Sequence, residues 1–484
     1  MTGKTTLHGI ALAASAVLLG VYAFPAGGVD WPVWGFDPAR SSFNPAERTL
    51  TAANVHNLRE RWQTRLGDVA DTAPIYLHSV RVGRTYRPML FETLRNGETL
   101  GIEATTGTVV WRFRTSGPNY THSAPAADAS GSAIYAPGID GRVHRLDPST
   151  GREIHAQGFP ATITLIPETE ANESALNVAN GYLYATISGY DGDRAPYDGH
   201  VVAIDLSSGK KTVFNSLCSD KRGLLDGTAC IQQRSGIWSR GGAVVDPAPA
   251  MNGRIYAATG NGDFNANRRG HNYGDSVISL SADLSDLYGS YTPTDYTELQ
   301  HGDGDLGSTS PAMLPEEKSS TTPWMLVQGG KDRILKLVNR AALPGVGNEL
   351  QLIKLPGALF ATPAVWTSNS GQAWIFLGFP DVVQAYRLET DSGSSRLVRV
   401  WNASPGQTGK EGTTAVLANG MVFIAYDGAL FALNALNGNV LWDSARHPKT
   451  IGNVHWSSPI VVNGWVYCSD ESANLTAFAL PAGR

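Results

Sequence analysis

The sequence has few charges and no familiar catalytic motif. Charged residues make up 17% of the 484 residues, and the formal net charge is only -5. No run of lysine and arginine occurs, so the chain lacks the electrostatic footprint of a nucleic-acid-binding protein. A GxSxG elbow, a P-loop and an HExxH helix are also absent, which removes three common signatures of hydrolases, nucleotide-binding proteins and zinc proteases.

Long apolar runs are equally scarce, and the one that stands out is at the N-terminus. Lys4 precedes an apolar stretch over Ile10–Val21, and small residues follow. This order predicts a signal peptide over residues 1–26, cleaved after Ala23 or Ala26. The stretch is short for a membrane span, which needs about 20 residues; an uncleaved anchor is the alternative. We therefore expect a periplasmic or extracellular protein without a membrane span after signal removal.

Cysteine is limited to three residues. Cys218 and Cys230 share one polar loop, which in an exported protein favours a disulfide over two unrelated thiols. Cys468 lies in a strand-like run and is expected to be a small buried hydrophobe. No CxxCH occurs, so no covalently attached c-type haem is expected, and no His/Cys spacing indicates zinc.

Glycine and tryptophan, by contrast, are abundant, with 53 and 12 residues. A turn unit recurs in which an acidic or amide residue is followed by Thr, Ser or Asn and then Gly, often with Trp beyond. The polar side chain caps such a turn and glycine supplies the positive φ, so each copy predicts a β-hairpin. The copies are Glu103–Gly107, Asp147–Gly151, Asp205–Gly209 and Asn434–Gly438, with Trp111 and Trp442 after the first and last.

A second element precedes each turn. It begins with a Ser/Thr-x-Pro/Ala pattern and continues through an Asn-Gly-like turn into an aromatic β run, as in Asn463–Tyr467. Such a run bounded by turn residues is typical of a strand. The starts lie near Thr72, Ser123, Ser174, Gly242, Ser310, Thr362, Thr413 and Ser458.

Eight units of about four strands predict an all-β fold, an eight-bladed β-propeller of four-stranded antiparallel blades. The last unit ends at Leu475–Leu480 without an outer strand, and the segment Asn57–Leu66 resembles the missing strand. We therefore predict that this N-terminal strand closes the ring and protects its edges. On this interpretation residues 30–484 form a single domain.

These repeats resemble the pyrroloquinoline-quinone (PQQ) enzyme repeat, and the chain resembles the quinoprotein alcohol dehydrogenase superfamily over nearly its whole mature length. The resemblance implies the propeller fold. It does not by itself imply catalysis, because scaffold proteins of outer-membrane assembly share the repeat. Function therefore has to be predicted from individual residues.

Three residues match the cofactor pocket of that superfamily. The Trp…Asp-Pro…Thr-Gly-Asn pattern is present with Trp238 and Asn261. The resemblance implies that Trp238 forms the floor under PQQ and that the Asn261 side-chain oxygen binds Ca²⁺. Lys331 falls where a family residue would hydrogen-bond the quinone oxygens. The structural alternatives are a core tryptophan, a turn asparagine and a solvated lysine.

Acidic residues complete the comparison. Asp191 falls where the family has a calcium-binding Glu, and Asp193 competes for that role. Asp303 and Asp305 fall where the family has its catalytic Asp, which would accept the substrate hydroxyl proton; Asp303 is also a candidate metal ligand. Either loop could instead be an ordinary Gly/Asp turn. The Ile451–Trp456 stretch, with Thr450 before it, resembles a late segment near the cofactor mouth.

The chain also departs from the family. Methanol-type members have two adjacent cysteines above the quinone and an Arg in the second unit near the cofactor carboxylates. Neither has a counterpart, and the second unit reads Tyr120-Thr-His122-Ser123 instead. A haem domain, usual in the polyvinyl-alcohol dehydrogenase branch, is missing too.

Two functions follow as hypotheses. The first is a PQQ- and calcium-dependent oxidoreductase that oxidises a small alcohol or polyol and passes electrons to an external acceptor such as a cytochrome. The second is a non-catalytic propeller that binds proteins or polymers. Convergence of Asp191, Asn261 and Lys331 beside Trp238 would favour the first, and their scatter over outer loops would favour the second.

Overall fold

The computed structural model describes residues 27–406, 410–446 and 451–481. The predicted signal peptide, residues 1–26, and Thr450 lie outside this part of the chain. Within it the structure is built from strands, with the single short α-helix α1 (Tyr296–His301). No helix in these ranges is both long and apolar enough to cross a membrane.

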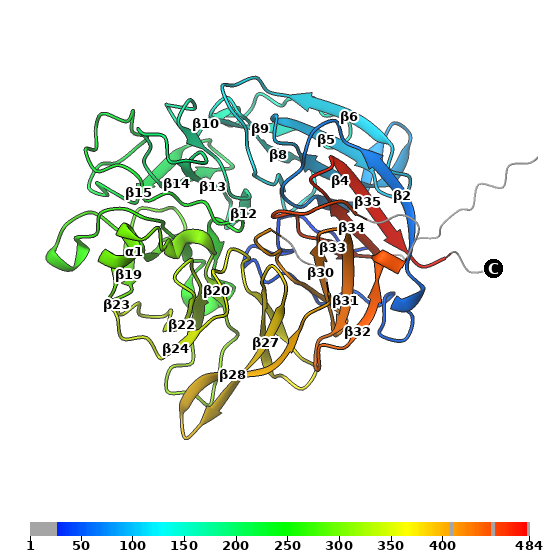
Figure 1. Ribbon diagram of the computed structural model, residues 1–484. Coiled ribbons are helices and arrows are strands. Elements are labelled where there is room, and N and C mark those ends of the chain that lie inside the picture. The colour runs from blue at the N-terminus through cyan, green and yellow to red at the C-terminus, as the bar shows by residue number, and fades with distance from the viewer. Residues whose placement is uncertain (1–26, 407–409, 447–450, 482–484) are drawn as a thin grey trace, which may run out of the picture.

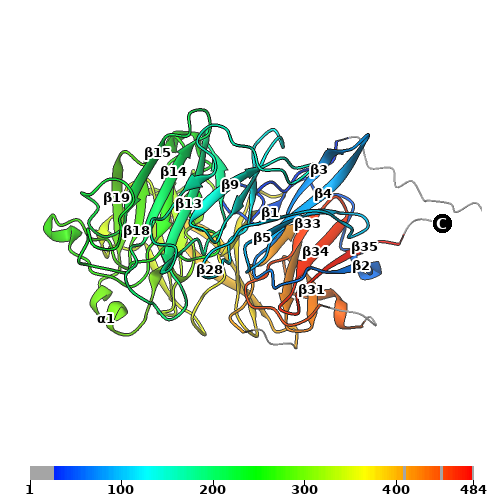
Figure 2. The same ribbon diagram turned by 90° about the horizontal axis from the view of Figure 1, so that it is seen from above.

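Eight sheets are arranged as blades around a central axis, as Figure 1 shows from one end and Figure 2 from the side. The strands within each blade are antiparallel neighbours, apart from short parallel additions at two edges. The predicted eight-bladed β-propeller is therefore confirmed. We number the blades 1 to 8 from the first complete sheet in the chain.

Strand bounds in the first half of the ring are given blade by blade. Blade 1 comprises β3 (Ile75–Val82), β4 (Thr85–Thr93), β5 (Glu98–Glu103) and β6 (Val109–Arg114). Blade 2 comprises β7 (Ala126–Ala127), β8 (Ile134–Pro137), β9 (Arg142–Leu146) and β10 (Ala161–Thr162). Blade 3 comprises β12 (Asn177–Ala179), β13 (Tyr182–Gly189), β14 (His200–Asp205) and β15 (Lys211–Asn215), with β11 (Glu170–Ala171). Blade 4 comprises β16 (Val244–Val245), β17 (Ile255–Ala258), β18 (Val277–Leu280) and β19 (Leu287–Thr292), with β23 (Gly345–Val346).

The second half of the ring follows the same plan. Blade 5 comprises β20 (Ala312–Met313), β21 (Met325–Gln328), β22 (Ile334–Asn339) and β24 (Gln351–Lys354). Blade 6 comprises β25 (Ala364–Thr367), β26 (Ala373–Gly378), β27 (Val383–Asp391) and β28 (Ser394–Ala403). Blade 7 comprises β29 (Val416–Ala418), β30 (Met421–Tyr426), β31 (Ala429–Asn434) and β32 (Val440–Asp443), with β1 (Phe43–Asn44). Blade 8 comprises β33 (Ile460–Val462), β34 (Trp465–Ser469), β35 (Asn474–Ala479) and β2 (Arg59–Arg65).

Short 3-10 turns connect some of these strands. They are η1 (Val55–Asn57), η2 (Pro249–Met251), η3 (Ala266–Arg268), η4 (Leu306–Ser308) and η5 (Ser444–Arg446). Each of the eight predicted starts lies two or three residues before the innermost strand of its blade, so the repeat was located correctly along the chain.

The ring is closed as predicted, by the N-terminal strand β2. It pairs antiparallel with β35, the last strand of the described chain, and Trp62 faces Ala477 across this pair. Figure 1 shows the two strands side by side, one near each end of the chain. The fourth strand of blade 8 thus comes from the opposite end of the sequence.

Adjacent blades are joined by tryptophans that pack on turn glycines. The Trp62 ring of blade 8 lies against Gly107 of blade 1, and the Trp111 ring of blade 1 lies against Gly151 of blade 2. A Cβ added at Gly107 would lie 2.6 Å from the Trp62 ring, and one at Gly151 would lie 2.4 Å from Trp111. Both glycines also have positive φ, of 74° and 69°, so glycine is required on two grounds.

The same tryptophans donate hydrogen bonds to the turns that they cover. Trp62 Nε1 donates to the Ala104 carbonyl at 3.1 Å, and Trp111 Nε1 donates to the Pro148 carbonyl at 2.9 Å. Blades 6 and 7 repeat the arrangement with Trp401 on Gly438. Each contact therefore joins the outer strand of one blade to the last hairpin of the next.

An N-terminal segment that sequence reasoning did not anticipate crosses the axis. Backbone or side-chain hydrogen bonds join this segment, Trp31–Asn44, to the innermost strands of seven blades. At its centre Arg40 is fully buried and donates to the carbonyls of Trp34, Ala175, Leu176 and Gly241. Because such a donor is costly to bury unless it is fully hydrogen-bonded, these contacts hold the segment across the ring.

The cysteines follow the prediction. Cys218 and Cys230 form a disulfide within the loop after β15. Cys468 is a fully buried free thiol in β34. Its burial raises the pKa of the thiol well above its usual value, so it behaves as an apolar core residue.

Trp62→Ala is expected to weaken ring closure. The substitution removes a partly buried ring and its hydrogen bond to blade 1, at a cost of about 2–4 kcal/mol of stability, by analogy with other buried tryptophans. Thermal unfolding at a fixed scan rate measures the effect. Tyr86→Ala is the control, because Tyr86 is 70% exposed on β4 and should change stability by less than about 0.5 kcal/mol. Equal unfolding midpoints for the two variants would contradict the proposed importance of this contact.

Candidate active site

A cavity of about 300 Å³ lies near the axis and is lined by two kinds of segment. One kind leads into the innermost strand of a blade, and the other is the turn between the second and third strands. Because these segments occupy the same end of every blade, the ring brings them together from distant parts of the chain. A cavity of this size suits a small organic ligand.

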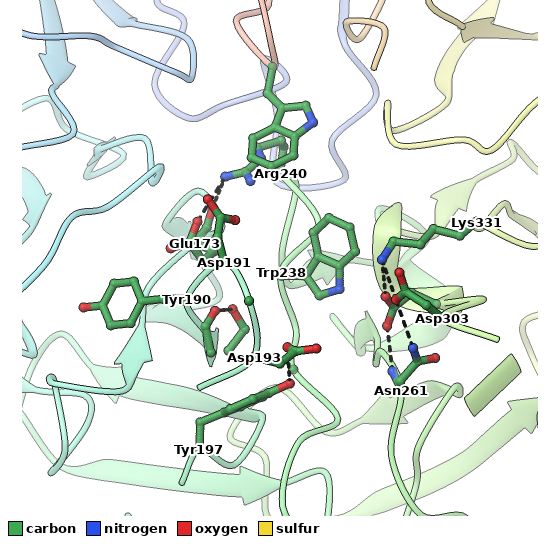
Figure 3. Close-up of a pocket in the computed structure, with 16 residues that line it drawn as sticks. Glu173, Tyr190, Asp191, Asp193, Tyr197, Trp238, Arg240, Asn261, Asp303 and Lys331 are labelled. Atoms are coloured by element: carbon green, nitrogen blue, oxygen red, sulfur yellow. Dashed lines mark hydrogen bonds and ion pairs between the residues drawn. The ribbon is translucent and has the colours of Figure 1, made fainter. Parts of the chain in front are cut away.

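All the site residues predicted from sequence line this one cavity. Figure 3 shows most of them around the indole of Trp238. Trp238 lies in the entry to blade 4, Asn261 follows β17, and Lys331 lies in the turn after β21. The full predicted set found here is Asp191, Trp238, Asn261, Asp303, Asp305 and Lys331.

Lys331 is the central cation of the cavity. Its ammonium lies 2.8 Å from Asp303 Oδ1 and 2.7 Å from Asp305 Oδ2, and 5.1 Å from the centroid of the Trp238 ring. Burial lowers the pKa of Lys331, but the two carboxylates outweigh it and raise the pKa above its usual value. Lys331 is therefore charged and is shared between two acids.

The two predicted catalytic acids differ in environment. The Asp303 side chain is 74% exposed, whereas that of Asp305 is 10% exposed. Burial raises the pKa of Asp305, opposed by Lys331 and by the Asn261 N–H, which donates to Asp305 Oδ1 at 2.7 Å. Since one ammonium serves two carboxylates, the pair retains an uncompensated negative charge facing the cavity.

Asn261 presents an unused oxygen. Its amide nitrogen donates to Asp303 Oδ1 at 3.2 Å, while its Oδ1 is buried without a hydrogen-bond partner. The preceding residue, Gly260, allows this approach, because a Cβ there would lie 2.4 Å from Asp305 Oδ1 and 3.1 Å from Trp238 Nε1. A buried amide oxygen beside a carboxylate is a donor pair that a hard cation favours.

The two candidates in the loop after β13 line different parts of the wall. Asp191 lies beside Glu173 and Arg240, whereas Asp193 lies on the side nearer Asn261 (Figure 3). The Tyr197 hydroxyl donates to Asp193 Oδ1 at 2.7 Å. Both residues are exposed and both line the cavity, so each stays a candidate metal ligand.

Sequence reasoning did not single out Glu173 and Arg240, which form a buried charged corner of the cavity. Arg240 Nη1 donates to the Glu173 carbonyl at 2.5 Å and lies 3.8 Å from its carboxylate. The Arg240 guanidinium also lies 3.7 Å from the centroid of the Trp456 ring. Of the late segment that resembled a cofactor mouth, Trp456 lines the cavity while Asn453 is exposed and does not.

A sequence signal for these residues exists. Glu173 immediately precedes the start of unit 3 at Ser174, and Asp71 and His122 hold the same place before Thr72 and Ser123. In the structure this position faces the axis: His122 lies 2.5 Å from Glu173 and 3.8 Å from Asp71. Alignment of the eight starts would therefore have predicted that the side chains of Asp71, His122 and Glu173 lie close together.

The fold and the cavity together define a propeller of the PQQ-repeat class. The family model described as outer membrane protein assembly factor BamB matches residues 26–245 and 371–484. This is more than half of the chain, and the chain belongs to that family. No curated protein sequence matches.

Solved structures give the same fold at low identity. The quinohemoprotein alcohol dehydrogenase from Comamonas testosteroni superposes with a TM-score of 0.65 and 16% identity, covering 94% of this chain and 81% of that one. A europium-containing methanol dehydrogenase gives 0.62 and 14%, covering 94% and 98%. BamB from Moraxella catarrhalis gives 0.51 and 12%, covering 88% and 99%. At these identities the likeness extends to the fold alone.

Gly260→Ala should disrupt the cavity without abolishing the ring. The added methyl meets Asp305 Oδ1, so either Asp305 or the Asn261 backbone has to move, at a cost of about 1–3 kcal/mol. The unfolding midpoint should therefore fall. Gly357→Ala is the control, since no atom lies within 4 Å of its added Cβ and its φ is not positive. A midpoint for Gly260→Ala equal to that of the control would show that the contact is not tight.

Proposed function

We propose that the protein is a PQQ- and metal-dependent oxidoreductase that oxidises a small alcohol or polyol in the periplasm or outside the cell. The observation that carries the proposal is the convergence of Trp238, Asn261, Lys331 and the Asp303–Asp305 pair on one cavity. Two structural neighbours, an alcohol dehydrogenase and a methanol dehydrogenase, support the reaction class.

The donor set fits a hard cation. The unpartnered Oδ1 of Asn261 and the carboxylate of Asp303 are adjacent, and Asp191 and Asp193 add oxygen donors from the opposite wall. We propose that these residues bind Ca²⁺. Europium is a second probe, because a structural neighbour is named for containing it. Lys331 now supplies the positive charge beside Asp303, and ion binding should displace it from that carboxylate.

The cavity also fits a flat, anionic cofactor. The half-buried Trp238 offers an aromatic surface on which a planar ring system stacks. Arg240 supplies a buried cation on the wall, in place of the family arginine that the second unit lacks. PQQ with a bound metal ion would supply a hydride acceptor and a Lewis acid. Lys331 would donate hydrogen bonds to the quinone oxygens.

The remaining step is removal of the hydroxyl proton, which we assign to Asp303 or Asp305. Loss of hydride from an alcohol requires removal of the hydroxyl proton, and a carboxylate such as Asp305, whose pKa burial raises, is suited to accept it. Asp303 and Asp305 both line the cavity, and each is a candidate base. Electrons then pass to a separate acceptor such as a cytochrome.

Reconstitution tests the proposal directly. Purified mature protein is incubated with PQQ and either Ca²⁺ or Eu³⁺, and alcohol-dependent dye reduction is followed over a panel of alcohols and polyols. We expect quinone binding and turnover with at least one of the two ions. Asp303→Asn and Asp305→Asn then assign the base as the variant that binds PQQ without turnover. Absence of quinone binding with both ions would refute the proposal and leave the scaffold function that the family description suggests.

Asn261→Ala isolates the metal ligand. Loss of the amide oxygen should weaken metal and PQQ binding at least tenfold, while the unfolding midpoint without ligand stays within about 2 °C of wild type, as for a substitution outside the core. Asn267→Ala is the matched control, because it removes an exposed asparagine of the same loop that does not line the cavity. Unchanged affinity in Asn261→Ala, measured by calorimetric titration with PQQ and the metal ion, would remove Asn261 from the site.

A further inference from the structure

A second polar cluster adjoins the cavity and has no role in the proposed dehydrogenase chemistry. Asp71 and His455 lie in the entries to blades 1 and 8, and Glu471 lies in the turn between β34 and β35. One ligand atom from each of these three residues lies within 4.8 Å of the other two. His122, in the entry to blade 2, approaches the same carboxylate of Asp71.

Each histidine of the cluster is held by a carboxylate on one ring nitrogen. Glu173 Oε2 lies 2.5 Å from His122 Nδ1, and Glu411 Oε2 lies 3.2 Å from His455 Nε2. The other nitrogen of each ring faces Asp71 Oδ2, at 3.8 Å for His122 Nε2 and 2.8 Å for His455 Nδ1. A carboxylate behind the ring is the usual arrangement of a metal-binding histidine, because it fixes the tautomer and the ring orientation.

The buried Nε2 of His122 gives independent support for a cation in this cluster. Its side chain is 2% exposed, and its Nε2 is buried without a hydrogen-bond partner. In the neutral ring, the hydrogen bond to Glu173 requires the proton on Nδ1, and the Nε2 lone pair then faces the Asp71 carboxylate. Two acceptors that face each other are stabilised only by a cation or a proton between them, since each has lost its water.

The net charge around these two rings is negative, so the charge also favours a bound cation. Four carboxylates contact the two rings, and they are Asp71, Glu173, Glu411 and Glu471. Arg240 is the arginine whose charge acts on three of them. Burial lowers the pKa of His455, but Asp71 and Glu411 outweigh it and raise the pKa to about 9, so a divalent cation would have to displace the ring proton. Once bound, it would offset most of the negative charge that remains.

We propose that Asp71, His122, His455 and Glu471 bind one divalent transition-metal ion of the Zn²⁺ class beside the cavity. Two imidazole nitrogens favour such an ion over Ca²⁺, which takes oxygen ligands. Ligands about 2.1 Å from a tetrahedral ion are about 3.4 Å apart, and the neighbouring separations of 2.8, 3.8 and 4.0 Å bracket this value. Ligand atoms of Asp71, His455 and Glu471 already lie within 4.8 Å of one another, whereas His122 Nε2 approaches only Asp71, so the His122 ring has to move to complete the set.

Calorimetric titration tests the site. The mature chain is stripped with a chelator, returned to buffer with excess Ca²⁺ to fill any oxygen-only site, and titrated with Zn²⁺. We expect one Zn²⁺ per chain, abolished in His455→Gln and weakened in His122→Gln. Glu411→Gln keeps every ligand but removes the carboxylate behind His455, so it should weaken binding about 10- to 100-fold.

His144→Gln is the matched control. His144 also lies between two carboxylates, Asp140 and Glu153, at 3.2 and 2.6 Å, but within the described residues it belongs to no group of three ligand atoms such as Asp71, His455 and Glu471 form. This variant should bind Zn²⁺ as the wild type does. Absence of stoichiometric Zn²⁺ binding by the wild type, or unchanged binding in His455→Gln, would overturn the proposal and identify the cluster as an ion-pair network.

Copper substitution distinguishes this site from any oxygen site. The electron paramagnetic resonance spectrum of bound Cu²⁺ should show hyperfine coupling to two nitrogens in the wild type and to one in His122→Gln. A spectrum without nitrogen coupling would contradict the ligand set. If His455→Gln does not fold, His122→Gln and Glu411→Gln still decide the question. Because neither measurement uses PQQ, failure of this proposal and failure of the dehydrogenase proposal are separate results.

Discussion

The packing of tryptophan on a turn glycine is the interaction on which the ring depends. Some innermost strands have only two residues, such as β7 and β16, so contact near the axis alone does little to fix one blade against the next. The Trp62–Gly107 contact and its repeats set this relation from the outside, through shape and one directed hydrogen bond. These contacts join blades 8 and 1, blades 1 and 2, and blades 6 and 7. The cavity draws its wall from blades 3, 4, 5 and 8, and closure of the ring at Trp62 holds blade 8 in its place there.

Local chemistry explains why the fold was predictable. Each turn unit carries its own capping side chain and glycine, so the repeats can be located without knowledge of distant contacts. The closing strand around Trp62 was predictable for the same reason, because the last unit lacked it. The N-terminal segment that crosses the axis was not predictable. Its Arg40 is stabilised by carbonyls of blades 3 and 4, and no sequence pattern connects these carbonyls to Arg40.

The candidate site was predictable only in part. Trp238, Asn261 and Lys331 were found through a family resemblance, and they do line one cavity. Glu173, Arg240 and the His122–His455 cluster were missed, because their contacts join blades far apart in the chain. Their common feature is a position at the entry to an innermost strand. These positions come close together only because the ring closes.

The segment that carries Arg40 gives the propeller a closed end. Arg40 donates to the carbonyls of Ala175 and Gly241, which neighbour the cavity residues Glu173 and Arg240 in sequence, so the crossing segment lies close to this side of the pocket. A ligand of the proposed site would therefore enter and leave on the side where Asp191 and Asp303 are exposed. In a pocket that is open on one side only, ligands would have to bind in order. The deepest ligand would enter first, and a ligand at the opening would prevent its release.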